Sequence, residues 1–191
     1  MSNIYSFSEF VKTGYSLVMT KLTMHQARLI RRPVYMRGAK SVEGCKGLTT
    51  GRFCRFDLDG HKKTLFIGDD CQFGDMTHIA AYEKVEIGNN VLIASKCYIS
   101  DTSHGSYKGE DQDSPDSLPV QRKHVHKPVS IGDNCWIGEN VVILAGSQIG
   151  RGCIIGANSV ITGSIPDGCI VVGNNRIIKK WDPETRRWEK V

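Results

Sequence analysis

The stretch "IGDNCW IGENVV ILAGSQ IGRGCI IGANSV ITGSIP", residues 131–166, decides the fold of this chain of 191 residues. Every block of six opens with isoleucine, and the interval holds without a break from Ile131 to Ile161. A period of six fits neither a helix, with about 3.6 residues per turn, nor the plain alternation of a strand. It fits a short strand followed by a tight turn, so the sequence predicts a chain that coils.

The same interval recurs upstream in two sets, which are Ile67, Phe73 and Ile79, and then Ile87, Ile93 and Ile99. The two sets are offset by eight residues, which predicts that two extra residues bulge from a corner within 82–84. If three units close one triangular coil, each aliphatic residue stacks on the one about 18 positions later. A continuous apolar column then fills the interior.

The fifth position of each unit supports a crowded interior, because its occupants are small or slender: Cys71, Thr77, Val91, Cys97, Cys135, Val141, Ser147, Cys153 and Ser159. Glu83 breaks this rule where the spacing slips. Four of the seven cysteines are thereby explained as core residues. An odd count without a CxxC pair favours thiols over disulfides or a zinc cluster.

The turns between units are also encoded. Glycine often follows the lead residue, and pairs such as Asp133-Asn134 and Glu139-Asn140 tolerate the positive φ that a tight corner requires. The sequence therefore predicts a mainly β protein built as a parallel β-helix.

The flanks are expected to differ from the coils. Residues 1–33 contain helix formers and a broken apolar pattern that ends at Pro33, which predicts an N-terminal helical segment. Residues 34–180 are assigned to the β-helix, with imperfect first coils. In 181–191, "WDPETRRWEKV", Asp182 as an N-cap and Pro183 at the first helical position predict a short C-terminal helix.

A long interruption falls inside the repeat. Residues 105–128 contain no six-residue unit and are crowded with polar and turn-forming residues, starting directly after His104. A loop of this length in so regular a fold is usually functional. Since the ordinary pKa of histidine is near neutrality, His104 is a candidate general base.

The repeat and this layout resemble the hexapeptide-repeat O-acetyltransferases of the galactoside and maltose acetyltransferase superfamily. The similarity runs from about residue 65 to 180 and includes "HIAAYEKVEIGNNVLIASKCYISDTSHG", the loop and "VSIGDNCWIGENVVI". The sequence is most similar to the O-acetyltransferases of lipopolysaccharide and capsule assembly. The resemblance implies a left-handed β-helix, although parallel crossovers are otherwise right-handed.

The resemblance also implies a direct transfer of acetyl from acetyl-CoA to a sugar hydroxyl, with His104 as the base. The main-chain N–H of Glu139 is the implied oxyanion donor. Asp101 has two alternative roles: it orients the imidazole of His104, or it caps a turn.

Donor and acceptor residues follow from the same family layout. The pantetheine arm is expected along the main chain at small residues, and the phosphates at the basic strand 174–180; the implied residues are Ala145, Gly146, Ala157, Thr162, Arg176, Lys179 and Lys180. Asp75 and His78 are candidate acceptor contacts. Trp136 is expected near the acetyl group or, alternatively, in packing.

Other functions remain open at this point. A γ-type zinc carbonic anhydrase shares the fold, and His78, His104, His124 and His126 make it worth testing, but its acidic and glutamine partners are not apparent. A non-catalytic β-helix would leave His104 unexplained. Antibiotic, serine and amino-sugar acetyltransferases are alternatives within the class. No metal requirement is expected.

Charge is concentrated at the N-terminus. Residues 1–40 contain seven basic residues and one acidic residue, while the whole chain carries +5. This segment suits either a solvated surface or contact with anionic lipid, and nucleic acid is not expected because aromatic residues do not interleave with the basic ones. The absence of a long apolar run predicts a cytoplasmic protein, with the inner face of the membrane as a possible site. The resemblance adds a homotrimer with active sites between subunits.

Overall fold

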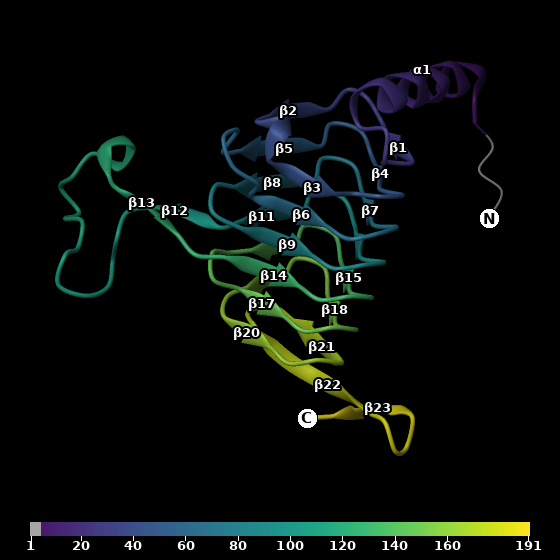
Figure 1. The fold of residues 1–191 in the computed structure, drawn as a ribbon. Helices are drawn as coiled ribbons and strands as arrows, with labels where there is room; N and C mark the ends of the chain where they lie inside the picture. Colours follow the sequence, from purple (N-terminus) through teal and green to yellow (C-terminus); the bar gives the residue numbers. More distant parts are fainter. Residues whose placement is uncertain (1–4) are drawn as a thin grey trace.

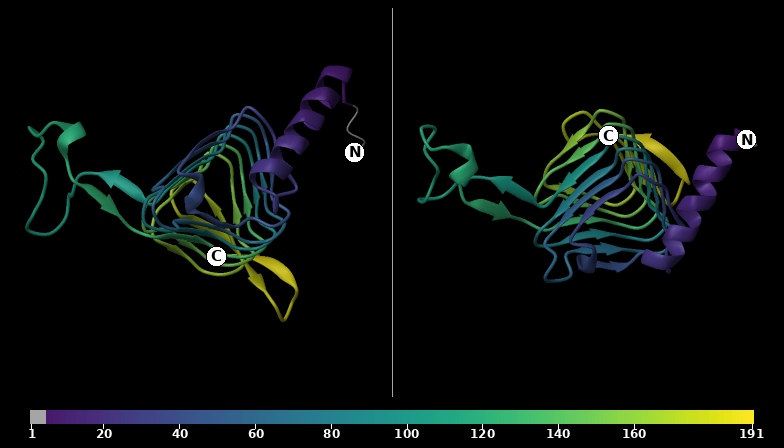
Figure 2. Two further views of the ribbon diagram at one scale, coloured as in Figure 1. Left: turned by 45° about the horizontal axis from the view of Figure 1, so that its top comes forward. Right: turned by 90° about the horizontal axis from the view of Figure 1, so that it is seen from above.

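The lead residues of the six-residue units are buried in a computed structural model that describes residues 5–191. Parallel pairing places Ile131 beside Ile149, 18 positions later, and the same interval separates the next two isoleucine pairs. The stacked coils form a three-sided prism, seen end-on in Figure 2. The architecture is the left-handed parallel β-helix that the sequence and its resemblance predicted.

Each face of the prism is one sheet. Face A contains β1 (Leu29–Ile30), β4 (Thr49–Thr50), β7 (Gln72–Phe73), β10 (Leu92–Ile93), β15 (Trp136–Ile137), β18 (Ile154–Ile155), β21 (Cys169–Val172), β22 (Arg176–Asp182) and β23 (Arg187–Lys190). Face B contains β2 (Tyr35–Arg37), β5 (Arg55–Leu58), β8 (His78–Ala81), β11 (Tyr98–Ser100), β16 (Val142–Ile143) and β19 (Val160–Ile161). Face C contains β3 (Val42–Gly44), β6 (Leu65–Ile67), β9 (Val85–Ile87), β14 (Val129–Ile131), β17 (Gln148–Ile149) and β20 (Ser164–Ile165).

The remaining elements lie outside the three faces. They are α1 (Phe7–Thr23), the short 3₁₀ helices η1 (Ala39–Ser41) and η2 (Pro119–Gln121), and the strand pair β12 (Thr102–His104) and β13 (His124–His126). Figure 1 shows α1 at the end of the prism that holds the first coils, and the strand pair projecting from its side. None of the helices in residues 5–191 is long and apolar enough to cross a lipid bilayer.

The corners confirm the predicted turn chemistry. Asn134 and Asn140 adopt φ of 57° and 56°, the left-handed region that asparagine tolerates. Each of the nine small or slender fifth-position residues is at most 1 % exposed. The seven cysteines are free thiols, as predicted, and the structure buries all seven, including the four predicted as core residues.

The N-terminal boundary differs slightly from the prediction. A single helix ends at Thr23, and β1 already pairs with β4 on face A, so the prism begins before residue 34. The helix is attached through hydroxyl groups: Ser16 Oγ accepts the N–H of Arg32 at 3.1 Å, and Thr20 Oγ1 accepts the N–H of Ile30 at 2.8 Å.

The predicted C-terminal helix is wrong. Residues 176–190 form an antiparallel hairpin that extends face A, with the Trp181 and Trp188 rings packed 5.5 Å apart between centroids. Asp182 accepts the N–H of Glu184 and the hydroxyl of Thr185, but these contacts close a turn instead of starting a helix. The free edge of β21 supplies hydrogen bonds that a lone C-terminal turn of helix would lack.

Candidate active site

The long interruption is an ordered arm, residues 102–127, that leaves the prism where face B meets face C. Its base is a two-stranded antiparallel ladder of β12 and β13, closed by the hydrogen bond from the N–H of Lys127 to the carbonyl of Asp101 at 2.8 Å. We call the corner that carries it the B/C edge, and the corner between faces A and B the A/B edge. The arm therefore positions His104 at a fixed place beside the coils.

His104 lies directly opposite His124 in the ladder, and both side chains are exposed. The two imidazole rings meet edge-on with 4.3 Å between their centroids. The carbonyl oxygen of His104 accepts the hydroxyl of Tyr107 at 2.6 Å, which fixes the chain as it leaves the strand. The predicted base is thus solvent-accessible on a two-stranded ladder, and no sequence pattern pointed to its pairing with His124.

The outer part of the arm is held by Arg122, which sequence reasoning did not single out. Its guanidinium donates to the Ser117 hydroxyl and carbonyl, each at 2.9 Å, and to the Tyr107 hydroxyl at 3.0 Å. Gly105 is buried with φ of 99°, and a β-carbon there would meet the Tyr107 ring. These contacts explain why so polar a loop is ordered.

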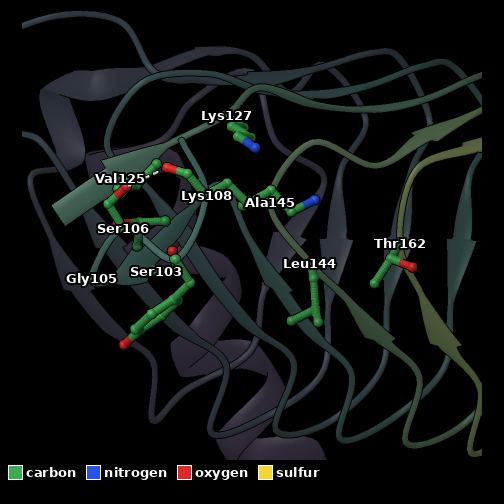
Figure 3. Close-up of a pocket in the computed structure, with 11 residues that line it drawn as sticks. Ser103, Gly105, Ser106, Lys108, Val125, Lys127, Leu144, Ala145 and Thr162 are labelled. Atoms are coloured by element: carbon green, nitrogen blue, oxygen red, sulfur yellow. Dashed lines mark hydrogen bonds between the residues drawn. The ribbon is translucent and has the colours of Figure 1, made fainter. Parts of the chain in front are cut away.

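A pocket of about 300 Å³ opens between the base of the arm and the B/C edge (Figure 3). The arm lines it with residues next to His104 in sequence, among them Ser103, Gly105 and Lys108, and the coils line it with Leu144, Ala145 and Thr162. Two of the predicted donor residues, Ala145 and Thr162, thus share this pocket with the arm. Lys108, Lys127 and Leu144 are lining residues that no sequence signal identified.

Asp101 has the second of its two predicted roles. Its carboxylate is fully buried and accepts the N–H groups of Tyr82, Glu83 and Lys84 at 2.7–3.0 Å. Those three residues are the corner where two extra residues were predicted to bulge. These contacts match the turn-capping alternative, and among residues 5–191 no hydrogen bond joins Asp101 to His104.

The residues predicted to bind acetyl-CoA, the acetyl donor, lie at two different edges of the prism. Gly146 lies with Ala145 at the B/C edge, where its N–H donates to the carbonyl of Lys127 at 3.1 Å. Glu139 and Ala157 lie at the A/B edge. Within the described chain, the N–H groups of Ala145, Glu139 and Ala157 have no protein acceptor, so they are free to bind a ligand.

Thr162 differs from this expectation. The side-chain amide of Asn175 accepts its N–H at 3.0 Å and donates to its carbonyl and its hydroxyl. Thr162 therefore offers surface to the pocket, while its polar main-chain groups are already bound. Asn175 adopts φ of 55°, and no pattern in the sequence marked it.

The predicted phosphate-binding residues Arg176, Lys179 and Lys180 lie on β22, which is a strand as expected. Lys179 pairs in register with Ile170 and Lys180 with Cys169, so the strand runs along face A at the last coils. The structure places these cations beyond Ala157 and not beside the arm of the same chain.

His78 belongs to a charged cluster on the outer side of face B. Its Nε2 lies 3.0 Å from Oδ2 of Asp57, which also accepts Nε of Arg55 at 2.6 Å. Burial alone would raise the pKa of Asp57, but the hydrogen bonds from Arg55 and His78 outweigh it and hold the pKa below its ordinary value. The Tyr98 ring packs 5.1 Å from the His78 ring, on the strand that leads into the arm.

The other two predicted substrate residues lie elsewhere. Asp75 is at the A/B edge, where its carboxylate accepts the N–H of Arg52 at 2.6 Å. Trp136 stands on the outer side of face A, between Leu92 and Ile154 in register, and is 52 % exposed. One chain therefore does not bring Trp136 or Asp75 to His104.

The histidines of the arm do not form a metal site. In residues 5–191 no three side chains of His, Cys, Asp or Glu are grouped closely enough to bind one metal ion. His124 and His126 lie two positions apart on β13 and so share one face of the ladder, with 6.2 Å between ring centroids. The carbonic anhydrase alternative needs three histidines that converge on one zinc ion, and no such group occurs among the described residues.

Comparison with known proteins shows the family of the chain. The bacterial transferase hexapeptide family (six repeats) matches residues 128–163. The chain is 39% identical over 188 residues to the putative lipopolysaccharide biosynthesis O-acetyl transferase WbbJ of Escherichia coli K12, and the match covers 97% of this chain and 95% of that protein.

Two solved structures extend the comparison. The hexapeptide-repeat acetyltransferase VCA0836 of Vibrio cholerae, in complex with acetyl coenzyme A, is 25% identical with a TM-score of 0.60, covering 93% of this chain and 91% of that one. The N-acyltransferase AntD of Bacillus cereus is 20% identical with a TM-score of 0.71, covering 97% and 94%, and shows a shared fold. Since the repeat, the fold and a full-length relative agree, the chain belongs to the hexapeptide-repeat acyltransferases.

Proposed function

We propose that this protein is an acetyl-CoA-dependent O-acetyltransferase that acetylates a sugar hydroxyl in a cell-surface polysaccharide or its precursor, such as an O-antigen, capsule or exopolysaccharide. The observation that carries the proposal is the exposed His104 on the two-stranded ladder of the arm, opposite His124. The pocket that contains Ala145 and Thr162 is lined by its neighbours Ser103 and Gly105 and not by His104 itself. The full-length similarity to a putative lipopolysaccharide O-acetyl transferase supports the acceptor class. The Vibrio cholerae relative with bound acetyl coenzyme A supports the donor.

In the proposed reaction an imidazole nitrogen of His104 takes the proton of the sugar hydroxyl as its oxygen attacks the thioester carbonyl. The tetrahedral oxyanion then collapses, the carbon–sulfur bond breaks, and the CoA thiolate takes the proton from His104. No covalent acyl-enzyme forms. General-base assistance of this kind contributes about a hundredfold to ten-thousandfold in rate.

The free main-chain N–H of Glu139 is the proposed oxyanion donor, because a preorganised donor stabilises the charge that develops in the transition state. The free N–H groups of Ala145 and Ala157 would hydrogen-bond the pantetheine amides. Arg176, Lys179 and Lys180 would bind the phosphates through their positive charge.

Two edges of the prism hold these groups, and one chain cannot bring them together. Glu139, Ala157 and the cations of β22 lie at the A/B edge and face A, whereas His104 lies at the B/C edge. We therefore propose a homotrimer in which the arm of one subunit faces the A/B edge of the next, and in which Trp136 and Asp75 join the site from that neighbour. In closed cyclic symmetry the same contact repeats around the ring.

The acceptor would bind on face B next to the arm. His78, Tyr98 and the Asp57–Arg55 pair present aromatic surface and hydrogen-bonding groups suited to a sugar. The proposed setting is the cytoplasmic side of the cell, where a sugar precursor and acetyl-CoA meet.

The test is an acetylation assay with purified full-length protein, acetyl-CoA and a panel of glycans, with products analysed by mass spectrometry and NMR. The expected product is a base-labile O-acetyl ester on one sugar hydroxyl. Acetylation confined to amines, or no transfer to any glycan despite bound acetyl-CoA, would overturn the proposal.

A further inference from the structure

The outward side of α1 is apolar along the whole helix. Its exposed side chains are, with their exposed fractions, Phe7 (83%), Phe10 (69%), Val11 (52%), Tyr15 (59%), Leu17 (45%), Val18 (59%) and Leu22 (75%). Spacings of three, four and seven residues put them on one face of a helix. A surface helix normally turns such a face toward the core, so this arrangement is inverted.

The inward side of the helix is polar and is already satisfied. Ser16 and Thr20 are its buried residues, and their hydroxyls bind the main chain of residues 30–32. Glu9 forms an ion pair with Arg52 at 2.7 Å, which fixes the first turn to the prism. These contacts hold the helix in this rotation, so the apolar face is a fixed feature of the surface.

The shape of this surface is a convex ridge. Both views in Figure 2 show α1 projecting past the corner of the prism, with no other described element beside its outer side. A contiguous exposed apolar surface of this kind marks a contact with a partner or a membrane.

The positive charge of residues 1–40 indicates which kind of partner suits this surface. Residues 1–40 carry seven basic side chains, of which Arg28 and Arg37 form ion pairs with carboxylates of the coils, and the one carboxylate of this segment, Glu9, is held by Arg52. Lys21 follows Leu17 by four positions on the helix, and its ammonium group donates to the carbonyl of Ala27 at 3.1 Å. Two copies meeting through this face would bring two strongly cationic segments together, which like-charge repulsion disfavours. An anionic surface is complementary to it.

We propose that the apolar face of α1, defined by the seven residues above, docks on an anionic lipid membrane. The helix would lie in the plane of the interface with Phe and Leu side chains among the acyl chains and the basic side chains at the headgroups. The sequence pointed to membrane contact through charge alone, whereas the structure adds the apolar surface that such contact needs. On the function proposed above, docking would bring the enzyme to glycans still attached to a lipid carrier.

The test is flotation of the full-length protein with vesicles of equimolar phosphatidylglycerol and phosphatidylethanolamine, and with phosphatidylcholine vesicles. The triple variant Phe10→Gln, Val18→Gln, Leu22→Gln removes apolar surface while glutamine keeps a good helix propensity. The matched control is Leu118→Gln with Val120→Gln, which changes side chains of similar exposure, 59% and 81%, on the arm. Circular dichroism checks that each variant folds, and sedimentation velocity measures its oligomeric state.

We expect the parent protein and the arm control to float with the anionic vesicles, and the triple variant to bind them at least about tenfold more weakly. Phosphatidylcholine vesicles should bind the parent less well. The proposal is overturned if the parent does not float with anionic vesicles, or if the folded triple variant floats as well as the parent. A smaller oligomer of the triple variant with unchanged vesicle binding would instead show that another copy covers this face. None of these readouts depends on acetyl transfer.

Discussion

Asp101 shows how one side chain supports the interruption of the repeat. Its buried carboxylate satisfies three consecutive main-chain N–H groups at the bulged corner 82–84, directly beneath the place where the arm leaves. The slip of two residues in the repeat predicted the bulge, and capping of a turn was one of the two roles predicted for Asp101. The sequence could not decide whether the Asp101 carboxylate binds a turn or the imidazole of His104, because Asp101 is only three positions from His104 and could reach either.

Replacing Asp101 by alanine should destabilise the fold, since three main-chain N–H groups would lose their acceptor. We expect a loss of about 3 kcal/mol or more in the free energy of unfolding, with an asparagine variant in between. Chemical denaturation followed by circular dichroism measures this. Asp59→Ala, which removes an acceptor from an exposed turn, is the control and should cost less. Equal stability of Asp101→Ala and the parent would contradict the assigned role.

The reactivity of a buried cysteine provides a second test of the packed interior. Burial raises the pKa of the Cys54 thiol to about 11. At pH 8 only about one Cys54 thiol in a thousand is then ionised, against roughly a quarter in the unfolded chain. Alkylation of Cys54 by iodoacetamide, followed by mass spectrometry, should be at least about a hundredfold slower in the folded protein than in urea. Equal rates in both would mean that this corner of the core is open.

At the scale of elements, the regular and irregular parts differ in how far the sequence determines them. The coils were predictable because each unit repeats the same local rule and pairs with a neighbour 18 residues away. The C-terminal segment was not, because Asp182 and Pro183 suit the start of a helix as well as a turn, and the free edge of β21 decided between them. A helical segment within residues 1–33 was predicted, but not which side of the helix faces the prism.

The arm is the element on which the site depends, and Arg122 is its main internal contact. Arg122→Ala should free the loop while leaving the prism intact, because its partners are Ser117 and Tyr107 within the arm. We expect chymotrypsin, which cuts after Tyr107 and Leu118, to cleave about five to a hundred times faster. The melting temperature of the prism should stay the same.

Lys123→Ala is the matched control for this change. Lys123 is the next residue, but its contact with Asp111 at 3.4 Å joins two side chains that are 80% and 97% exposed. Pairs of this kind contribute little. Equal cleavage of the Arg122→Ala and Lys123→Ala variants would show that the arm is ordered by something other than Arg122.

At the scale of the whole molecule, the groups of the proposed site lie at two edges of the prism. This separation predicts how a mixture of two inactive variants behaves. Ala157→Trp should block the donor groove at the A/B edge, and His104→Ala should remove the base at the B/C edge. If a site uses one edge from each of two subunits, trimers assembled from equal amounts of the two inactive chains regain about a quarter of the parent activity. An inactive mixture would place each complete site within one subunit.

The central claim is that His104 is the general base of acetyl transfer. The most direct measurement is the turnover of acetyl-CoA with a glycan acceptor by His104→Ala, with acetyl-CoA binding followed by calorimetry and His25→Ala, an exposed histidine remote from the arm, as control. The account predicts that kcat falls by about a hundredfold to ten-thousandfold in His104→Ala while acetyl-CoA affinity and the control stay near the parent values. Turnover by His104→Ala within a few fold of the parent would remove this histidine from the chemistry and contradict the account.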